Sequence, residues 1–268
     1  MGRSVILAGA PRCPGCCLPP RWCTCGLLPP VVTRLPVQVL IHRQEHQKPT
    51  SSGRLVVRAV ANAAGFVYQR QNHFFPATGY PTVDSGSSRR LWVLHPSGDP
   101  MPLTDITDDD ASTWPTILLL DGTWRQAREM LPEMRSRGRC VRLPEGSSGE
   151  PSRYWLREQP GPSQLSTAES LVHLLHAFGE FDAERQLRNH FELFVYATLL
   201  ARGRREMSER YLGHSPLPTE AHEAIDRLHA RPSAYRMCAA TDCRLERPQR
   251  SAIARGMSSE SETKPSPS

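Results

Sequence analysis

The stretch that decides the fold is TILLLDGTWRQA, residues 116–127. Residues 116–120 form an apolar run, and apolar side chains on both faces are typical of a central parallel strand. Asp121 and Gly122 end the strand, and we expect a helix from about Thr123 to Leu131. A carboxylate at the carboxyl end of a buried strand lies where open α/β sheets bind ligands.

The residues alone leave two interpretations of Asp121 open. Its carboxylate could face a ligand, or it could be the N-cap of the following helix, with Trp124 as a core anchor. Thr123 is a second candidate for the same cap, because a threonine hydroxyl can accept from the first free N–H groups of a helix.

Similar patterns extend in both directions from this stretch. Short apolar runs predict strands, and apolar residues at helical spacing behind Ser51 or Ser52, behind Ser166 and after Asp182 predict helices. The strands are expected at 37–41, 66–68, 91–94 and 140–143, and the helices at 51–60, 166–178 and 182–205. Strands that alternate with helices favour an α/β fold. We expect loops at 78–88 and 105–110 and a disordered tail beyond residue 246.

Composition limits the function classes. The chain has 268 residues and a formal charge of +6, and it contains no apolar run of the ~20 residues that a membrane helix needs. The apolar run near residue 5 is too short for a signal peptide, so we expect a cytoplasmic protein with no membrane partner. Only Lys48 and Lys264 among the 33 basic residues are lysines. Arginine suits bidentate contact with phosphate.

Five of the eight cysteines lie within the first 25 residues. Cys13 and Cys16 form one close pair and Cys23 and Cys25 another, which favours a structural Zn²⁺ site with four thiolates. Cys17 is surplus, because Cys16 gives the usual two-residue spacing. The alternative is a loop of free buried thiols. Two distant cysteines, 238 and 243, could form a further pair.

The run DGTW at 121–124 resembles the Asp-x-Thr-Trp signature of the DTW-domain family, the tRNA-uridine aminocarboxypropyltransferases. Further blocks are similar to that family in the same order. They are the cysteine spacing, HRQE at 42–45 with TSSGRL at 50–55, YWLR at 154–157 and LSTAE at 165–169. The chain departs from the family at Ser51, Ser52 and Ser170, and Cys17 is an extra thiol.

The resemblance implies a SPOUT-like α/β fold, with a parallel sheet, flanking helices and a knotted chain. It implies a zinc knuckle over 1–34, a catalytic domain over 35–212 and a C-terminal extension over 213–245. The implied reaction moves the 3-amino-3-carboxypropyl group of S-adenosylmethionine to N3 of a tRNA uridine and gives methylthioadenosine. tRNA is therefore the expected partner, with no obligate protein partner.

The implied site has three groups of residues besides the cysteines. Asp121 would be the catalytic base that removes the N3 proton of uracil. The residues expected to bind the donor are Leu119, Gly122, Thr123, Trp124, Leu165, Ser166, Thr167 and Glu169. The residues expected to bind the substrate are His42, Glu45, Thr50, Ser52, Gly53, Arg54, Arg125, Arg128, Tyr154 and Arg157. Ser166 and Thr167 could cradle a carboxylate at a helix N-terminus, and Ser166 with Glu169 also fits a capping box.

Two other functions compete with this one. A SPOUT-type RNA methyltransferase would use the same donor and transfer its methyl group. A zinc-knuckle RNA-binding protein would carry out no catalysis and would leave the strand–turn–helix at 116–127 unexplained. Six arginines between 125 and 142 favour an RNA-binding surface in every case.

Overall fold

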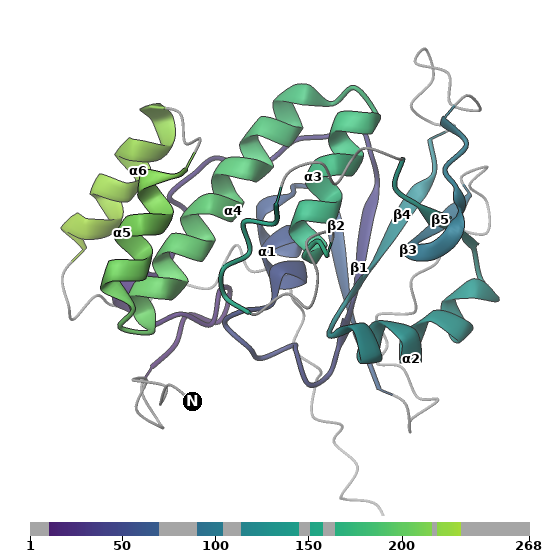
Figure 1. Ribbon diagram of the computed structural model, residues 1–268, viewed down its shortest axis with the longest axis horizontal. Coiled ribbons are helices and arrows are strands. Elements are labelled where there is room, and N and C mark those ends of the chain that lie inside the picture. Colours follow the sequence, from purple (N-terminus) through teal and green to yellow (C-terminus); the bar gives the residue numbers. More distant parts are fainter. Residues whose placement is uncertain are drawn as a thin grey trace, which may run out of the picture.

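The computed structural model describes residues 11–69, 90–103, 114–144, 151–157, 164–215 and 219–231 (Figure 1). Within these residues five parallel strands form a sheet in the order β2-β1-β4-β3-β5. The strands are β1 (Val37–His42), β2 (Ala63–Tyr68), β3 (Leu91–Pro100), β4 (Thr116–Asp121) and β5 (Arg139–Arg142). The predicted α/β fold with a parallel sheet is confirmed.

Strand β4 lies at the centre of the sheet, as its apolar sequence predicts. Its residue Leu119 pairs with Val39 of β1 on one side and with Leu94 of β3 on the other. Ile117 and Leu118 are fully buried on opposite faces. A strand whose two edges and two faces are all covered is mostly apolar, and this one is apolar from Ile117 to Leu120.

Helices cover both faces of the sheet (Figure 1). The described helices are the short 3-10 helix η1 (Pro20–Trp22), α1 (Ser52–Ala59), α2 (Trp124–Arg135), α3 (Thr167–Ala177), α4 (Phe181–Ala201), α5 (Arg205–Gly213) and α6 (Thr219–Ala230). Met130 and Met134 of α2 pack on one face. The apolar residues of α1, α3 and α4 share the larger core on the other face. Helices α5 and α6 pack outside α4.

Two helix boundaries differ from the predicted ones. Helix α2 continues past Leu131 and contains Pro132, because Met134 beyond the proline is completely buried on the sheet. The predicted helix over 182–205 ends at Ala201, and α5 begins separately. Gly203 between them has a φ of 70°, the left-handed conformation that commonly ends helices.

Some predictions fall outside the described residues. They concern the loops at 78–88 and 105–110, the tail beyond 246 and the pair Cys238 and Cys243. The knot implied by the resemblance stays a prediction, as do the domain boundaries. No helix in the described part of the chain is long and apolar enough to cross a membrane.

The N-terminal segment and α6 are joined by reciprocal arginine contacts. Arg21 donates to the carbonyl oxygens of Leu228, His229 and Arg231 at the end of α6. In return, Arg231 donates to the carbonyl oxygens of Cys23 and Cys25. Helix α6 therefore forms one wall of the cysteine-rich segment, although about 200 residues separate them in sequence.

His190 of α4 holds the chain that follows this segment. Its Nε2 lies 2.8 Å from the carbonyl oxygen of Pro29, and the whole residue is 7% exposed. Burial lowers the pKa of His190 to about 4, although the contact with Pro29 opposes the shift. The ring is therefore neutral at pH 7 and donates its Nε2 proton to Pro29.

This lowered pKa predicts acid sensitivity. The unfolded chain, with a histidine pKa of about 6.5, takes up the proton before the folded chain does. The contribution of neutral His190 to the free energy of unfolding is therefore complete above about pH 6.5. It falls by roughly 3 kcal/mol as the pH drops from about 6.5 to about 4. Denaturant unfolding at several pH values should show a smaller loss for His190→Gln, which keeps a donor for Pro29 but does not titrate. Equal losses in both proteins would contradict this role.

Candidate functional site

The carboxyl ends of β1 and β4 lie side by side in the sheet. From β1 the chain passes to β2 on one side, and from β4 it passes to β5 beyond β3 on the other side. The strand order reverses between these two neighbours. In open parallel sheets such a switch point leaves a crevice at the carboxyl edge, where ligands bind. Asp121, the last residue of β4, lies at this point.

The carboxylate of Asp121 accepts three hydrogen bonds in a buried position. Its Oδ1 accepts from the backbone N–H of Gly53 and from the hydroxyl of Thr167, each at 2.8 Å. Its Oδ2 accepts from the hydroxyl of Ser51 at 2.7 Å. Asp121 is only 4% exposed. The carboxylate thus joins the N-termini of α1 and α3 to the end of the central strand.

The caps of the helices explain this convergence. Ser51 caps α1 through the N–H of Arg54, and its hydroxyl proton remains for Asp121. Ser166 caps α3 in a complete capping box with Glu169, as predicted. Thr167 is then the first helical residue, with its hydroxyl toward Asp121. Both positive helix ends therefore point at the same anion.

Thr123, not Asp121, caps helix α2. Its hydroxyl accepts from the N–H of Gln126, and the side chain of Gln126 accepts from the N–H of Thr123. The interpretation of Asp121 as the N-cap of this helix is therefore wrong. Trp124 is half-buried and contacts His95, so it is not a buried core anchor either.

Gly53 must be a glycine for Asp121 to sit where it does. A Cβ at position 53 would lie 2.5 Å from Cβ and from Cγ of Asp121. Real side chains do not approach so closely, and both the strand end and the helix start are held by their neighbours. The close approach also explains how the N–H of Gly53 reaches the carboxylate.

We expect Gly53→Ala to push α1 away from β4. The destabilisation should be about 1–3 kcal/mol, the range for overpacked sites, and is measured by denaturant unfolding. Gly213→Ala in α5 is the matched control, because a Cβ there meets nothing within 4 Å. Equal stability of Gly53→Ala and Gly213→Ala would show that the contact with Asp121 carries no strain.

A second buried cluster lies beside this site. Arg157 donates to the carboxylate of Glu45 and to the hydroxyl of Thr50, and Tyr154 donates to the carbonyl oxygen of Thr50. Lys48 contacts Glu45 at 2.7 Å. Burial would raise the pKa of Glu45, but Lys48 and Arg157 outweigh it and lower the pKa. Burial raises the pKa of Tyr154, so its hydroxyl stays protonated. These contacts join the loop after β1 to the loop before α3.

His42 lies on the other face of the sheet from Asp121. Ile41 is the β1 residue in register with Asp121, and successive strand residues alternate between faces. His42 accordingly lies 4.0 Å from Glu129 of α2, and burial lowers its pKa. Gly122 lies between the two faces, near His42 and Gln126. The structure therefore does not bring His42 to the carboxylate of Asp121.

Arg54 faces the cysteine-rich segment. Its guanidinium donates to the carbonyl oxygens of Pro14, Gly15 and His46, and the residue is 4% exposed. One turn further along α1, Arg58 donates to the hydroxyl of Thr24 at 2.7 Å and lies 3.8 Å from Sγ of Cys25. Helix α1 thus connects the cysteine-rich segment to Asp121. The contacts that the structure shows for Arg54 are internal.

Four cysteine sulfurs form a cluster that could hold zinc. The Sγ atoms of Cys13, Cys16, Cys23 and Cys25 lie within 4.8 Å of one another. Two of the Sγ–Sγ distances are 3.7 Å, and a tetrahedral Zn²⁺ with Zn–S bonds of ≈ 2.3 Å gives about 3.8 Å. The cluster contains Cys16, which the two-residue spacing favours, whereas Cys17, with a φ of 58°, lies outside it.

We expect about one equivalent of zinc in the purified chain, measured by elemental analysis. Cys16→Ser should lose the metal and much of its stability, because the segment has few other means of folding. Cys17→Ser, its immediate neighbour, should keep both. Less than about half an equivalent of zinc in the wild-type chain would contradict the site.

The remaining predicted residues have diverse surroundings. Leu119 is a core residue, Ser52 is buried in the first turn of α1, and Arg125 and Arg128 are exposed on α2. The carboxylate of Glu169 accepts from the hydroxyl of Ser152 and from the N–H groups of Arg153 and Ser166. The structure therefore gives Glu169 an internal role, whereas Arg125 and Arg128 remain accessible.

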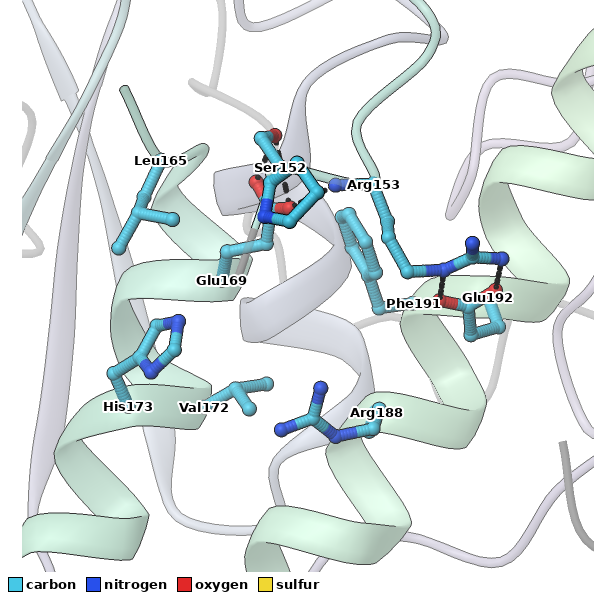
Figure 2. A pocket seen from close by; sticks show the side chains of 10 residues that line it. Ser152, Arg153, Leu165, Glu169, Val172, His173, Arg188, Phe191 and Glu192 are labelled. Carbon is cyan, nitrogen blue, oxygen red and sulfur yellow. Dashed lines mark hydrogen bonds and ion pairs between the residues drawn. The ribbon is translucent and has the colours of Figure 1, made fainter. Parts of the chain in front are cut away.

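Figure 2 shows a pocket between α3 and α4, beside the loop before α3. Leu165 and Glu169 line it, together with His173 and Arg188. Thr167 and Glu169 are two residues apart on α3, so their side chains point in nearly opposite directions. The pocket accordingly does not include Asp121, which Thr167 contacts.

Sequence reasoning missed several residues of the site. The hydrogen bond from Ser51 to Asp121 and the contacts of Gln126 and Arg58 do not follow from the sequence patterns. Arg58 follows Arg54 by four residues, and this spacing places both on one face of a helix. That face meets the cysteine segment, so the spacing was the available signal.

These features define a class of protein: an α/β domain with a parallel sheet, a buried carboxylate at its switch point and an attached four-cysteine cluster. The DTW domain model matches residues 10–199, so the chain belongs to the DTW domain family. It is similar to tRNA-uridine aminocarboxypropyltransferase 2 of Drosophila melanogaster, with 28% identity over 169 residues. The alignment covers 61% of this chain, which spans 65% of the length of that relative. No solved structure matches the chain.

Proposed function

We propose that this protein is a tRNA-modifying transferase that moves the 3-amino-3-carboxypropyl group of S-adenosylmethionine to N3 of a uridine in tRNA. Membership of the DTW family and the named relative support this function. The observation that carries it is the buried Asp121 at the switch point, where the N-termini of α1 and α3 converge.

The chemistry of this convergence fits the amino-acid end of the proposed donor. A zwitterion carries a carboxylate and an ammonium group close together. The N-termini of α1 and α3 favour an anion, and the carboxylate of Asp121 favours a cation. The backbone N–H groups in the first turn of α3, beside the capped Ser166 and Thr167, would therefore hold the donor's carboxylate, and Asp121 would face its ammonium or sulfonium charge. S-adenosylmethionine, when bound, supplies a carbon that is already activated by the positive sulfur.

The proposed reaction requires the removal of one proton. The bond between uracil N3 and the aminocarboxypropyl carbon forms as the carbon–sulfur bond breaks, and methylthioadenosine leaves as a neutral thioether. The N3 proton needs an acceptor, and general bases contribute 10²–10⁴-fold to such steps. A carboxylate offers about four lone pairs. Three of those on Asp121 accept hydrogen bonds from Ser51, Gly53 and Thr167, so one lone pair remains for this proton.

The exposed arginines supply a surface for the phosphates of tRNA. Arg125 and Arg128 lie on α2, directly after the turn that contains Asp121. Three further arginines are exposed: Arg135 at the end of α2, Arg137 in the following turn and Arg139 at the start of β5. Arginines clustered beside a candidate site favour backbone contact with nucleic acid.

The function is tested by incubating the metal-loaded protein with tRNA and S-adenosylmethionine. Mass spectrometry of the tRNA nucleosides should find 3-(3-amino-3-carboxypropyl)uridine, and chromatography should find methylthioadenosine in equal amount. S-adenosylhomocysteine and a methylated nucleoside would instead identify a methyltransferase. Binding of tRNA without any product or donor binding would identify an RNA-binding protein without catalysis.

The role of Asp121 as the base predicts that Asp121→Asn lowers turnover by roughly 10²–10⁴-fold. The variant should fold, because Ser51 can turn its hydroxyl to accept from the new amide. Asp99→Asn, at an exposed position on β3, is the control. Near-normal turnover of Asp121→Asn would leave Asp121 only the structural role described above.

A further inference from the structure

Strand β3 contains a bulge at the carboxyl edge of the sheet. Leu94 and Asp99 are both in register with Val141 of β5, so residues 95–98 have no partner in β5. A Cβ on Gly98 would lie 2.5 Å from the backbone of Val141, so only glycine allows this close approach. Leu94 also pairs with Leu119, two residues before Asp121. Bulges of this kind re-aim side chains and are common next to active sites.

The bulge is held firmly by its neighbours. Arg135 donates to the hydroxyl and the carbonyl oxygen of Ser97, at 2.8 and 3.0 Å. Arg142 donates to the carbonyl oxygen of Gly98 at 3.0 Å. The backbone N–H of Ser97 donates to Nδ1 of His95 at 3.1 Å, and the hydroxyl of Ser97 lies 2.8 Å from the same nitrogen.

These contacts determine the tautomer of His95. Because Nδ1 accepts a hydrogen bond, the proton of the neutral ring is on Nε2. Burial lowers the pKa of His95, and the charges of Arg135 and Arg128 lower it further. His95 is therefore a neutral side chain that presents one fixed N–H donor.

That N–H group has no acceptor among the residues that the structure describes. His95 is only 8% exposed, and its buried Nε2 has no hydrogen-bond partner among the described residues. A buried donor without an acceptor costs about 1–3 kcal/mol. The half-buried indole of Trp124 lies beside the His95 ring. The two ring centroids are 6.4 Å apart, and the ring planes are at 75° to each other. An unsatisfied buried donor beside an aromatic side chain calls for a ligand with an acceptor atom.

We propose that His95 and Trp124 form a nucleobase site, in which the Nε2–H of His95 donates to an acceptor on the edge of the base and Trp124 packs against the base. Nucleobases combine an aromatic face with ring-nitrogen and carbonyl acceptors at the edge, and aromatic side chains bind them by stacking. Trp124 follows Asp121 by three residues, and His95 follows Leu94, so this site lies at the same carboxyl edge of the sheet as the proposed reaction centre. The inference rests on the proposed function, which offers two sources of the base: the adenosine of the donor and the tRNA.

Two substitutions distinguish the role of the His95 Nε2–H group from the role of its Nδ1 in holding the bulge. His95→Asn keeps an oxygen near the position of Nδ1, so it still accepts from Ser97, but it has no group that reaches the position of Nε2. His95→Gln places an amide N–H near the position of Nε2 and loses the acceptor for Ser97. His176→Asn, at an exposed histidine near the end of α3, is the control for the substitution itself.

Calorimetry with methylthioadenosine and, separately, with unmodified tRNA measures the effect. His95→Asn should weaken binding of one of the two probes by about tenfold, the equivalent of one hydrogen bond, and His95→Gln and His176→Asn should bind nearly as wild type. Weaker binding of methylthioadenosine identifies the base as adenine of the donor, and weaker binding of tRNA alone identifies a tRNA base. Wild-type binding of both probes by His95→Asn, or equal losses in His95→Asn and His95→Gln, would overturn the proposal.

A measurement on the wild-type chain covers the case in which His95→Asn does not fold. In protein with ¹⁵N-labelled histidine, the Nε2 resonance that is missing in His95→Gln belongs to His95. This resonance should shift when the bound probe accepts its proton, and an unchanged resonance at saturation would overturn the proposal. Binding is read without turnover, so a failure to modify tRNA would count against the proposed function and not against this site.

Discussion

The rest of the site depends on the hydrogen bonds that the buried carboxylate of Asp121 accepts. An anion removed from water at the end of an apolar strand is costly unless donors surround it. The N–H of Gly53 and the hydroxyls of Ser51 and Thr167 supply them, from segments 68, 70 and 46 residues away. This requirement brings the first turns of α1 and α3 to one point and excludes any side chain at position 53.

Much of the fold follows from local patterns in the sequence. The apolar run before Asp121 and the serines before α1 and α3 predict the central strand and both caps, because a strand buried on both faces and a capped helix each depend on neighbouring residues. The ends of α2 and α4 could not be predicted in this way. Helix α2 passes Pro132 because Met134 is buried on the sheet, a tertiary contact, and Gly203 ends α4 by a backbone conformation that glycine permits but does not require.

The candidate site was less predictable because the same types of side chain can form hydrogen bonds within the protein or with a ligand. The guanidinium of Arg54 suits a phosphate as well as it suits carbonyl oxygens, and only the folded neighbours reveal the carbonyl oxygens of Pro14 and Gly15. Glu169 likewise serves the loop before α3. The bulge at His95 arises from a register shift against β5, which no periodicity in the sequence records. The cysteine cluster was predictable because its ligands are close in sequence.

The contact between Arg21 and the end of α6 has a consequence for synthesis of the chain. The residues that meet there are separated by 207 to 210 positions in the sequence. Ribosomes add about 5–20 residues per second. The four cysteines therefore emerge roughly 10–40 seconds before the wall against which they pack. During that interval the cysteine-rich segment lacks the hydrogen bonds that Arg231 donates to the carbonyl oxygens of Cys23 and Cys25. The contacts between Arg21 and α6 can therefore stabilise the cysteine-rich segment only after residue 231 has been added to the chain.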